Sequence, residues 1–352
     1  MWHFALAAGT TLAVLTAAGK DCYYKPDSAG GSGAIDAATR WDGDVPDTGD
    51  FAFFDPSRFS PNVPMNVTIS AEDWDYLKRV GRLQPRTATV TITFDLGDED
   101  VSWGGQIYGP GTFVKKGAGA FRMTRDSSVA MSYSGRLIVS NGLFRIGKQY
   151  QNLTDGQFPI FEVCSPGVLQ LSESITWAKG LCGNGSVTNS LSSSQINFLT
   201  SNDTFEFSGR FLSAISLSAG TVSALMANKN ICHQYFTMDD YERQVTLRLY
   251  NGFLGAKKFG MSGEPSSLGG GSGASDRRIY VFDGGYRNAK TGLVNLGTEP
   301  QTTDRSIRFV NGANGFIFTF DGGAHGGVTH QGEGQNPNAD DGSSHIIPLA
   351  FW

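Results

Sequence analysis

Short runs in which apolar and polar residues alternate fill much of the chain after residue 110. In Arg136–Ser140, Leu137 and Val139 alternate with Arg136, Ile138 and Ser140. Such period-two alternation predicts β-strands that each bury one face. The same pattern marks residues 121–123, 143–147, 168–171, 204–207, 214–218, 243–250 and 315–323. In the last run we expect Phe316, Phe318 and Phe320 to be buried and Thr319 to be exposed.

One segment departs from this alternation. Between Ser70 and Gly81, the apolar residues Trp74, Leu77 and Val80 are spaced three apart. This spacing predicts one or two helical turns packed on a sheet, with Ser70 as the N-cap and Gly81 at the end. A bent strand is the alternative.

The predicted strands recur along the chain. Phe121 and Phe144 are 23 residues apart, Phe113 and Leu137 are 24 apart, and each interval holds about three short strands. Coils of this length are typical of a parallel β-helix, a solenoid in which equivalent residues stack on successive coils. The Gly-x-Gly at 117–119 would form a corner, because glycine accepts positive φ. We therefore predict an all-β solenoid with the Phe121 and Phe144 rings stacked one coil apart.

The composition supports a folded chain with many turns. Glycine is 46 of 352 residues, while hydrophobic residues make up 39% and aromatic residues 12%, which is enough for a core. The net charge is −5 and only 17% of residues are charged. This charge balance excludes the basic footprint of a nucleic-acid-binding protein.

The N-terminus carries an apolar stretch, Phe4–Ala18, that ends in small residues. This stretch predicts a signal peptide over residues 1–19, with the mature chain starting near Lys20. It is too short for a membrane-spanning helix, so we expect no such segment in the mature chain. An ordinary first strand is the alternative.

Glycine- and serine-rich stretches suggest how the remainder is divided. Residues 20–50 are predicted to be a flexible lead-in and residues 51–230 the β-helix repeat region. Residues 231–352 form a C-terminal β region, which either continues the coil or folds as a separate lobe.

The four cysteines, Cys22, Cys164, Cys182 and Cys232, include no C-x-x-C pair, so a zinc site is poorly supported. Cys164 and Cys182 are 18 residues apart, roughly one short coil, and a disulfide could join them in an exported protein. Buried free thiols fit the sequence equally well.

Residues 102–147 resemble the autotransporter-associated β-strand repeat. Residues 39–55 are similar to the segment that often precedes the first coil of such proteins, and residues 167–189 resemble a second, weaker repeat. The resemblance implies a right-handed parallel β-helix that is secreted or exposed at the cell surface. The chain is either a stand-alone relative or a fragment of a longer passenger. The residues that match the repeat are Gly105, Ile107, Gly109, Gly111, Phe113, Lys115 or Lys116, Gly117, Gly119, Phe121, Met123, Tyr133, Gly135 and Gly142–Ile146.

No catalytic motif stands out, and two weak metal candidates are present. His325 and His330 lie near Asp321 and Glu333 and could bind a transition metal, although a solvated glycine loop is favoured. The acidic residues within 97–100 could meet Ca²⁺, although a polar strand end is favoured. We therefore assign no catalytic, metal or cofactor-binding residue.

The outward strand positions are rich in arginine and poor in clustered acids, with Glu206 as the lone outward carboxylate. We predict a structural or adhesive scaffold without catalysis, for which cell-surface or extracellular glycans are the candidate partners. The alternatives are a glycan-binding module and a β-helix polysaccharide lyase or hydrolase, which needs positioned acids. The outward arginines are Arg122, Arg136, Arg145 and Arg248, and the candidate glycan platforms are Trp103, Tyr108 and Trp177.

Overall fold

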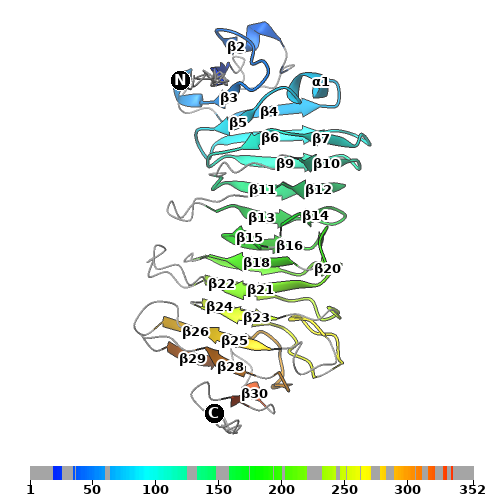
Figure 1. Ribbon diagram of the computed structural model, residues 1–352, viewed down its shortest axis with the longest axis vertical. Helices are drawn as coiled ribbons and strands as arrows, with labels where there is room; N and C mark the ends of the chain where they lie inside the picture. Colours follow the sequence, from blue (N-terminus) through cyan, green and yellow to red (C-terminus); the bar gives the residue numbers. More distant parts are fainter. Residues whose placement is uncertain are drawn as a thin grey trace, which may run out of the picture.

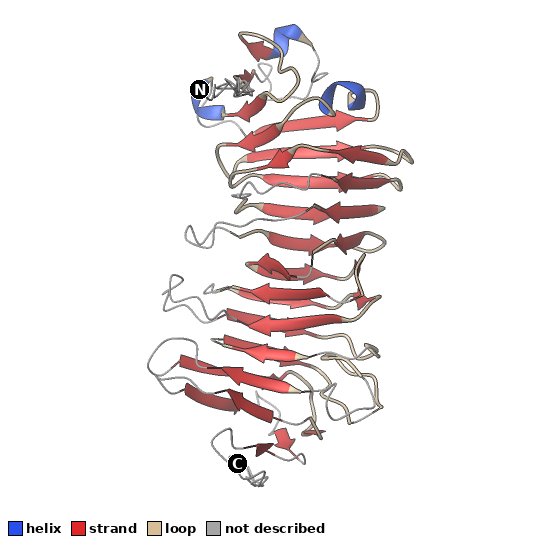
Figure 2. Cartoon of the chain, viewed as in Figure 1, coloured by secondary structure: helices blue, strands red, loops and turns tan. Residues whose placement is uncertain are grey.

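The chain forms an elongated stack of strands whose order along the long axis follows the sequence (Figure 1). Strands account for most of the regular structure, and the few helical turns lie near the N-terminal end (Figure 2). The computed structural model describes residues 19–25, 35, 37–59, 64–124, 133–147, 158–173, 175–192, 194–199, 203–219, 232–242, 246–250, 252–261, 263–270, 278–282, 289–305, 307–310, 316–321, 328–330 and 334–335.

One sheet, here called the long sheet, runs along the whole stack and contains eleven of the described strands. Each neighbouring pair in it is parallel. In chain order its strands are β4 (Met65–Ser70), β6 (Val90–Asp95), β9 (Thr112–Lys116), β11 (Arg136–Val139), β13 (Ile160–Val163), β16 (Gly180–Gly183), β19 (Thr204–Phe207), β22 (Cys232–Phe236), β24 (Gly252–Ala256), β26 (Ala289–Asn295) and β29 (Phe316–Asp321).

Three shorter sheets and one strand pair form the other faces of the coils. The N-terminal sheet contains β1 (Asp21–Tyr24), β2 (Trp41–Asp42), β3 (Phe51–Phe54), β5 (Arg82–Pro85) and β8 (Gln106–Ile107). The middle sheet contains β7 (Val101–Trp103), β10 (Ala120–Met123), β12 (Leu143–Ile146), β14 (Val168–Leu171), β17 (Ser186–Asn189) and β20 (Arg210–Phe211). The C-terminal sheet contains β15 (Ile175–Ala178), β18 (Ser194–Phe198), β21 (Ile215–Ala219), β23 (Leu247–Leu249), β25 (Ile279–Phe282), β28 (Ile307–Val310) and β31 (Gly334–Gln335). The separate pair is β27 (Gln301–Thr303) and β30 (Val328–His330).

The strand pairing confirms the predicted parallel β-helix. Phe121 on β10 pairs in register with Phe144 on β12, and their rings stack with centroids 5.2 Å apart and planes 14° apart. Phe113 pairs with Leu137 in the same way on the long sheet. Within the four larger sheets, β2 departs from the pattern by pairing antiparallel with β1.

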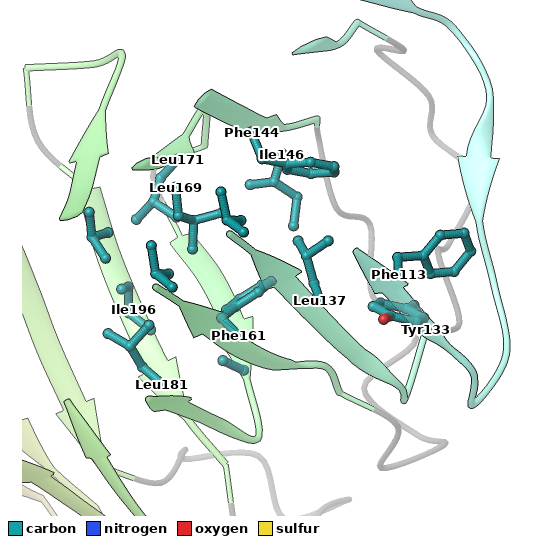
Figure 3. Close-up of a cluster of buried hydrophobic side chains, with 14 of the residues drawn as sticks. Phe113, Tyr133, Leu137, Phe144, Ile146, Phe161, Leu169, Leu171, Leu181 and Ile196 are labelled. Carbon is teal, nitrogen blue, oxygen red and sulfur yellow. The ribbon is translucent and has the colours of Figure 1, made fainter. Parts of the chain in front are cut away.

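Inward side chains from the stacked coils form a continuous core. Figure 3 shows part of it, where Phe113, Leu137 and Phe161 from the long sheet lie near Phe144 and Leu169 from the middle sheet. All five side chains are fully buried. Burial of a large apolar side chain stabilises the fold by about 1.5–3 kcal/mol, so each added coil strengthens the column.

Glycines form the corners, as the sequence predicts. Gly117 and Gly142 have φ values of 77° and 65° between a long-sheet strand and the next middle-sheet strand. A Cβ on Gly142 would lie 2.5 Å from the carbonyl oxygen of Gly119, closer than any side chain tolerates. Stacked corners therefore require glycine for its backbone conformation and for its lack of a side chain.

The predicted helix is present but short. It is α1 (Trp74–Leu77), and the N-cap position belongs to Asp73 rather than Ser70, because Ser70 is the last residue of β4. The Asp73 carboxylate accepts hydrogen bonds from the backbone N–H and the hydroxyl of Ser70, both at 2.7 Å. The Trp74 ring packs edge-on against Phe121 at 5.8 Å, so α1 sits on the sheet as expected. Two 3₁₀ helices, Ala38–Arg40 and Pro56–Arg58, lie nearby.

Strands are also found near both ends of the chain. In the predicted lead-in, β1 pairs parallel with β3 and buries Cys22. Within residues 231–352, strands β22, β24, β26 and β29 extend the long sheet. The predicted signal peptide lies outside the described residues up to position 18, as do the side chains of Phe316, Phe318 and Phe320.

Candidate functional site

The three predicted aromatic platforms occupy different environments. Trp103 is fully buried, and its indole N–H donates to the Val80 carbonyl at 3.0 Å, which excludes it as a surface platform. Tyr108 is partly exposed beside the N-terminal sheet, and Trp177 is partly exposed on β15. The structure therefore keeps Tyr108 and Trp177 as candidates but places them on separate sheets.

Two outward carboxylates form ion pairs across neighbouring coils, and one of them, Glu162, lies on β13, so the expectation that Glu206 is the lone outward carboxylate in a strand is wrong. Arg136 donates to Glu162 at 2.6 Å, and both residues are on the long sheet. Asp100 accepts from the Ala120 backbone N–H at 2.7 Å and from Arg122 at 3.0 Å. The hydrogen bond from the Ala120 backbone is the larger cause, and that from Arg122 the next, of a lowered pKa of the Asp100 carboxyl. Within the acidic segment 97–100, the Asp100 carboxylate thus joins one coil to the next.

The described part of the chain contains no cluster that could hold a metal ion. Glu206 accepts a hydrogen bond from the Thr237 hydroxyl at 3.0 Å. Across the described residues, no group of three His, Cys, Asp or Glu side chains comes close enough to hold a metal ion. His325 and Glu333 lie outside the described residues, and only the backbones of Asp321 and His330 are described.

Cys164 and Cys182 are free thiols, so the disulfide between them is not formed in this structure. The register explains this outcome. Cys182 on β16 is the register partner of Glu162 on β13. Cys164 lies two residues beyond Glu162, so the two cysteines are not register partners. Burial, followed by the nearby Glu162 carboxylate, raises the pKa of the Cys182 thiol to about 11. At neutral pH this thiol is therefore protonated and a poor nucleophile.

The outer face of the C-terminal sheet brings together polar and aromatic side chains that are far apart in the sequence. Trp177 pairs in register with Asn197, and the same row continues through Ser218, Arg248 and Tyr280. Arg248 reaches back to donate to the Gln195 side chain at 2.6 Å. We call Trp177, Asn197, Ser218, Arg248 and Tyr280 the C-terminal row. Trp177, Arg248 and Tyr280 are partly exposed, whereas Asn197 and Ser218 are buried, so the row offers aromatic and guanidinium groups at the surface.

The outer face of the N-terminal sheet carries arginines that stack on aromatic rings. The Cζ atom of Arg82 lies 4.2 Å from the ring centroid of Phe51 and 4.0 Å from that of Tyr108. Phe51 and Arg82 are register partners on β3 and β5. The Arg82 guanidinium is therefore held by rings from two different coils, and such cation–π contacts contribute about 0.5–2 kcal/mol each.

A second group of stacked side chains lies on the same sheet. Tyr23 and Phe53 are register partners whose ring centroids are 5.1 Å apart. The Cζ atom of Arg58 lies 3.8 Å from the Tyr23 centroid, and that of Arg86 lies 4.2 Å from the Phe53 centroid. Each ring of the stacked pair thus has its own guanidinium. We call the whole set the arginine–aromatic ladder: Tyr23, Phe51, Phe53, Arg58, Arg82, Arg86 and Tyr108.

The ladder carries surplus positive charge. Arg58 pairs with Asp42 at 3.1 Å. The guanidinium groups of Arg82 and Arg86 have no hydrogen bond or ion pair with any other described residue, and the Nε atom of Arg82 is buried without a partner. In a chain of net charge −5, this sheet therefore presents a local cationic surface.

Sequence reasoning identified Tyr108 but missed the rest of the ladder. The alternation of Phe51 and Phe53 and the pair Arg82 and Arg86 are visible in the sequence. Their meeting depends on the register between β3 and β5, which separates the partners by 31 residues. That interval is longer than the 23- and 24-residue repeat, so the repeat alone does not bring them together.

Comparison of the chain with protein-family models, with curated proteins and with solved structures finds no match. Among the described residues, no helix combines the length and apolar character needed to cross a membrane. The outer faces of the solenoid therefore supply the observations on which function is proposed.

Proposed function

We propose that this protein is a secreted or surface-exposed structural scaffold of adhesive type, related to the passengers of autotransporters, and that it acts without catalysis. The observation that carries this proposal is the long sheet, in which eleven described strands pair in parallel from one end of the stack to the other. A solenoid of this kind forms a stiff rod whose faces and loops can be displayed away from a surface.

The hydrogen bonding of the outward acids supports the same role. Glu162 is paired with Arg136, Asp100 with Arg122, and Glu206 accepts from Thr237. Hydrolysis of a glycosidic bond by the usual route needs two carboxylates at a defined separation, one of them with a raised pKa. Carboxylates held by cations and hydroxyls suit cohesion between coils better than acid–base chemistry.

Surface labelling tests the location. Intact cells that produce the full chain are treated with a membrane-impermeant amine reagent, and the culture medium is assayed in parallel. We expect the chain to be labelled on intact cells or to be recovered from the medium. Labelling only after lysis, with a cytosolic marker behaving identically, contradicts the proposal.

An activity assay tests the absence of catalysis. The purified chain is incubated with pectin, alginate and neutral glycans, with and without Ca²⁺, and unsaturated products and new reducing ends are measured. We expect no product above a heat-inactivated control. Product that disappears on a single carboxylate substitution favours the lyase or hydrolase alternative.

Glycan binding is the second candidate function, and the C-terminal row favours it. Trp177 is partly exposed and offers a ring face for a sugar, and the partly exposed Arg248 guanidinium, farther along the same row, offers donors for hydroxyl groups. On a glycan array, we expect Trp177→Ala to weaken binding, while Tyr280→Phe, which keeps the other ring of the row, changes it little. Equal binding by wild type and Trp177→Ala removes this row from consideration.

A further inference from the structure

We propose that the arginine–aromatic ladder binds anionic polysaccharides, whose acidic groups accept hydrogen bonds from the guanidinium edges of Arg82 and Arg86. The inference rests on the proposed function of an adhesive scaffold. It adds a ligand class and a site on the N-terminal sheet, separate from the C-terminal row.

The stacking prepares the arginines for a planar acidic group. The Arg82 guanidinium lies over the rings of Phe51 and Tyr108 at 4.2 and 4.0 Å, with β5 between β3 and β8 in the sheet, and the Arg86 guanidinium lies over Phe53 at 4.2 Å. Ring contacts use the flat sides of a guanidinium and leave its terminal N–H groups directed sideways. Those groups match a carboxylate or sulfate in a bidentate arrangement. Because the rings already restrict both side chains, less conformational entropy is lost when an anion binds.

The charges on this face favour an anion. Arg58 is paired with Asp42, Asp21 is the register partner of Phe51, and the Asp55 carboxylate accepts a hydrogen bond from the Ser57 N–H. None of these three carboxylates accepts a hydrogen bond from Arg82 or Arg86. The guanidinium groups of Arg82 and Arg86 therefore have no hydrogen-bond or ion-pair partner among the described residues.

The placement of the arginines favours a polymer over a small anion. Arg82 begins β5 and Arg86 follows its last residue. Four residues of extended strand separate the two Cα atoms by roughly 13 Å, so one small anion does not reach both. A chain of acidic sugars carries charges at repeated intervals and can engage both arginines at once, which raises its affinity through effective concentration.

Single-stranded nucleic acid is also a polyanion, but the ladder does not suit it. Binding of that kind relies on ring faces on which bases stack. Here Tyr23 and Phe53 stack on each other and on arginines, while Phe51 and Tyr108 both stack on Arg82. The ladder offers edge donors more than free ring faces, which favours acidic sugars.

The test is titration of the purified full chain with matched pairs of polymers. Oligogalacturonate is compared with its methyl ester, and dextran sulfate with dextran, at low and at physiological salt. We expect both acidic polymers to bind and both neutral partners to bind at least tenfold more weakly, with affinity falling as salt rises. Equal binding of a neutral partner, no binding of either acidic polymer at low salt, or tighter binding of oligothymidylate overturns the proposal.

Substitutions localise the binding. We expect Arg82→Gln and Arg86→Gln each to weaken oligogalacturonate binding by roughly tenfold or more. Arg82→Lys keeps the charge but loses the planar fork, so it should weaken binding too. Arg145→Gln is the matched control, because Arg145 lies outward on the middle sheet and its Nε atom also lacks a partner.

A loss of affinity in Arg145→Gln as large as in Arg82→Gln overturns the assignment to the ladder. If a ladder variant misfolds, the ¹⁵Nε–¹H resonances of the wild-type arginines give the answer. Those of Arg82 and Arg86 should shift on addition of oligogalacturonate, and that of Arg145 should stay. A failure of this binding leaves the surface-labelling result untouched, so the ligand and the location are tested separately.

Discussion

At the scale of single residues, Gln234 closes a gap in the long sheet. β16 pairs with β19 at Gly183 and Phe207. Two residues earlier, Leu181 gives both backbone groups to the Gln234 side chain: its N–H donates to Oε1 at 2.9 Å, and its carbonyl accepts from Nε2 at 2.8 Å. Gln234 is fully buried and lies on β22, two strands along the sheet from β16. Its side-chain amide takes the place of a backbone peptide group of the strand between them.

We expect Gln234→Ala to lower the free energy of unfolding by about 1–3 kcal/mol or more, because a buried N–H and a buried carbonyl lose their partners. The measurement is urea denaturation followed by circular dichroism. Gln170→Ala, which removes an outward amide from β14, is the control and should cost less than 1 kcal/mol. Equal effects of the two substitutions would show that the Gln234 amide does not matter to the sheet.

Lys115 gives a second residue-scale prediction, in its case about pH. Its side chain is fully buried, and Nζ donates to the carbonyls of Lys116 and Gly117 at 2.7 Å and of Asn141 at 3.2 Å. Burial lowers the pKa of this amine from 10.5 to about 8, although Asp95 and Asp100 oppose the shift. Between these two pH values the unfolded chain holds a proton that the folded chain has lost. Stability from this group therefore rises with pH across that window.

We expect the stability difference between wild type and Lys115→Met to shift in favour of wild type by roughly 1–2 kcal/mol between pH 7 and pH 9.5. Denaturation curves at the two pH values measure it. Lys116→Met removes the exposed neighbour and should retain the wild-type slope. If the free energy of unfolding varied with pH in the same way for wild type and Lys115→Met, the pKa of Lys115 would be that of an ordinary lysine.

At the scale of elements, the corner between the long and middle sheets depends on stacked glycines. Gly97, Gly117 and Gly142 all have positive φ, and they occur after β6, β9 and β11. A Cβ on Gly117 would lie 2.3 Å from the carbonyl oxygen of Gly97 on the preceding coil. The corner of one coil therefore fits directly over the corner of the last.

We expect Gly142→Ala to destabilise the protein by more than about 2 kcal/mol, because the left-handed conformation costs about 1–2 kcal/mol and the contacts add to it. Two controls separate these causes by thermal denaturation. Gly43→Ala keeps the positive φ in open space, and Gly104→Ala has open space without positive φ. A cost for Gly142→Ala no greater than that for Gly43→Ala would rule out the contact contribution.

At the scale of the whole molecule, the stack is held by contacts between neighbouring coils, so stability should vary along its length. Strands β11 and β13 have partners on both sides, while β4 and β29 are the outermost described strands of the long sheet. We expect amide hydrogen exchange to be slowest in β11 and β13 and faster in β4 and β29. Exchange measured by mass spectrometry tests this. Equal protection of all four strands would indicate a single cooperative unfolding unit.

The sequence by itself determined the local geometry of this protein. Alternation assigned Leu137, Val139, Phe144 and Ile146 to the core and Arg136 to the surface, because side chains on a strand alternate whatever the strand packs against. The 23-residue spacing of Phe121 and Phe144 predicted the stacked coils. Alternation depends on neighbouring residues and the coils on a spacing that recurs along the chain, so a pattern of residue types is sufficient to reveal both.

Only the tertiary structure decided which side chains meet across coils. Register partners are 24 residues apart from Phe113 to Leu137 but 20 apart from Phe161 to Leu181. Coil length varies because each corner and loop can hold a different number of residues without altering the strands. No fixed period therefore predicts that Gln234 reaches Leu181, or that Arg82 lies between Phe51 and Tyr108. The candidate ladder depends on these meetings, so it became visible only once the register of the folded chain was known.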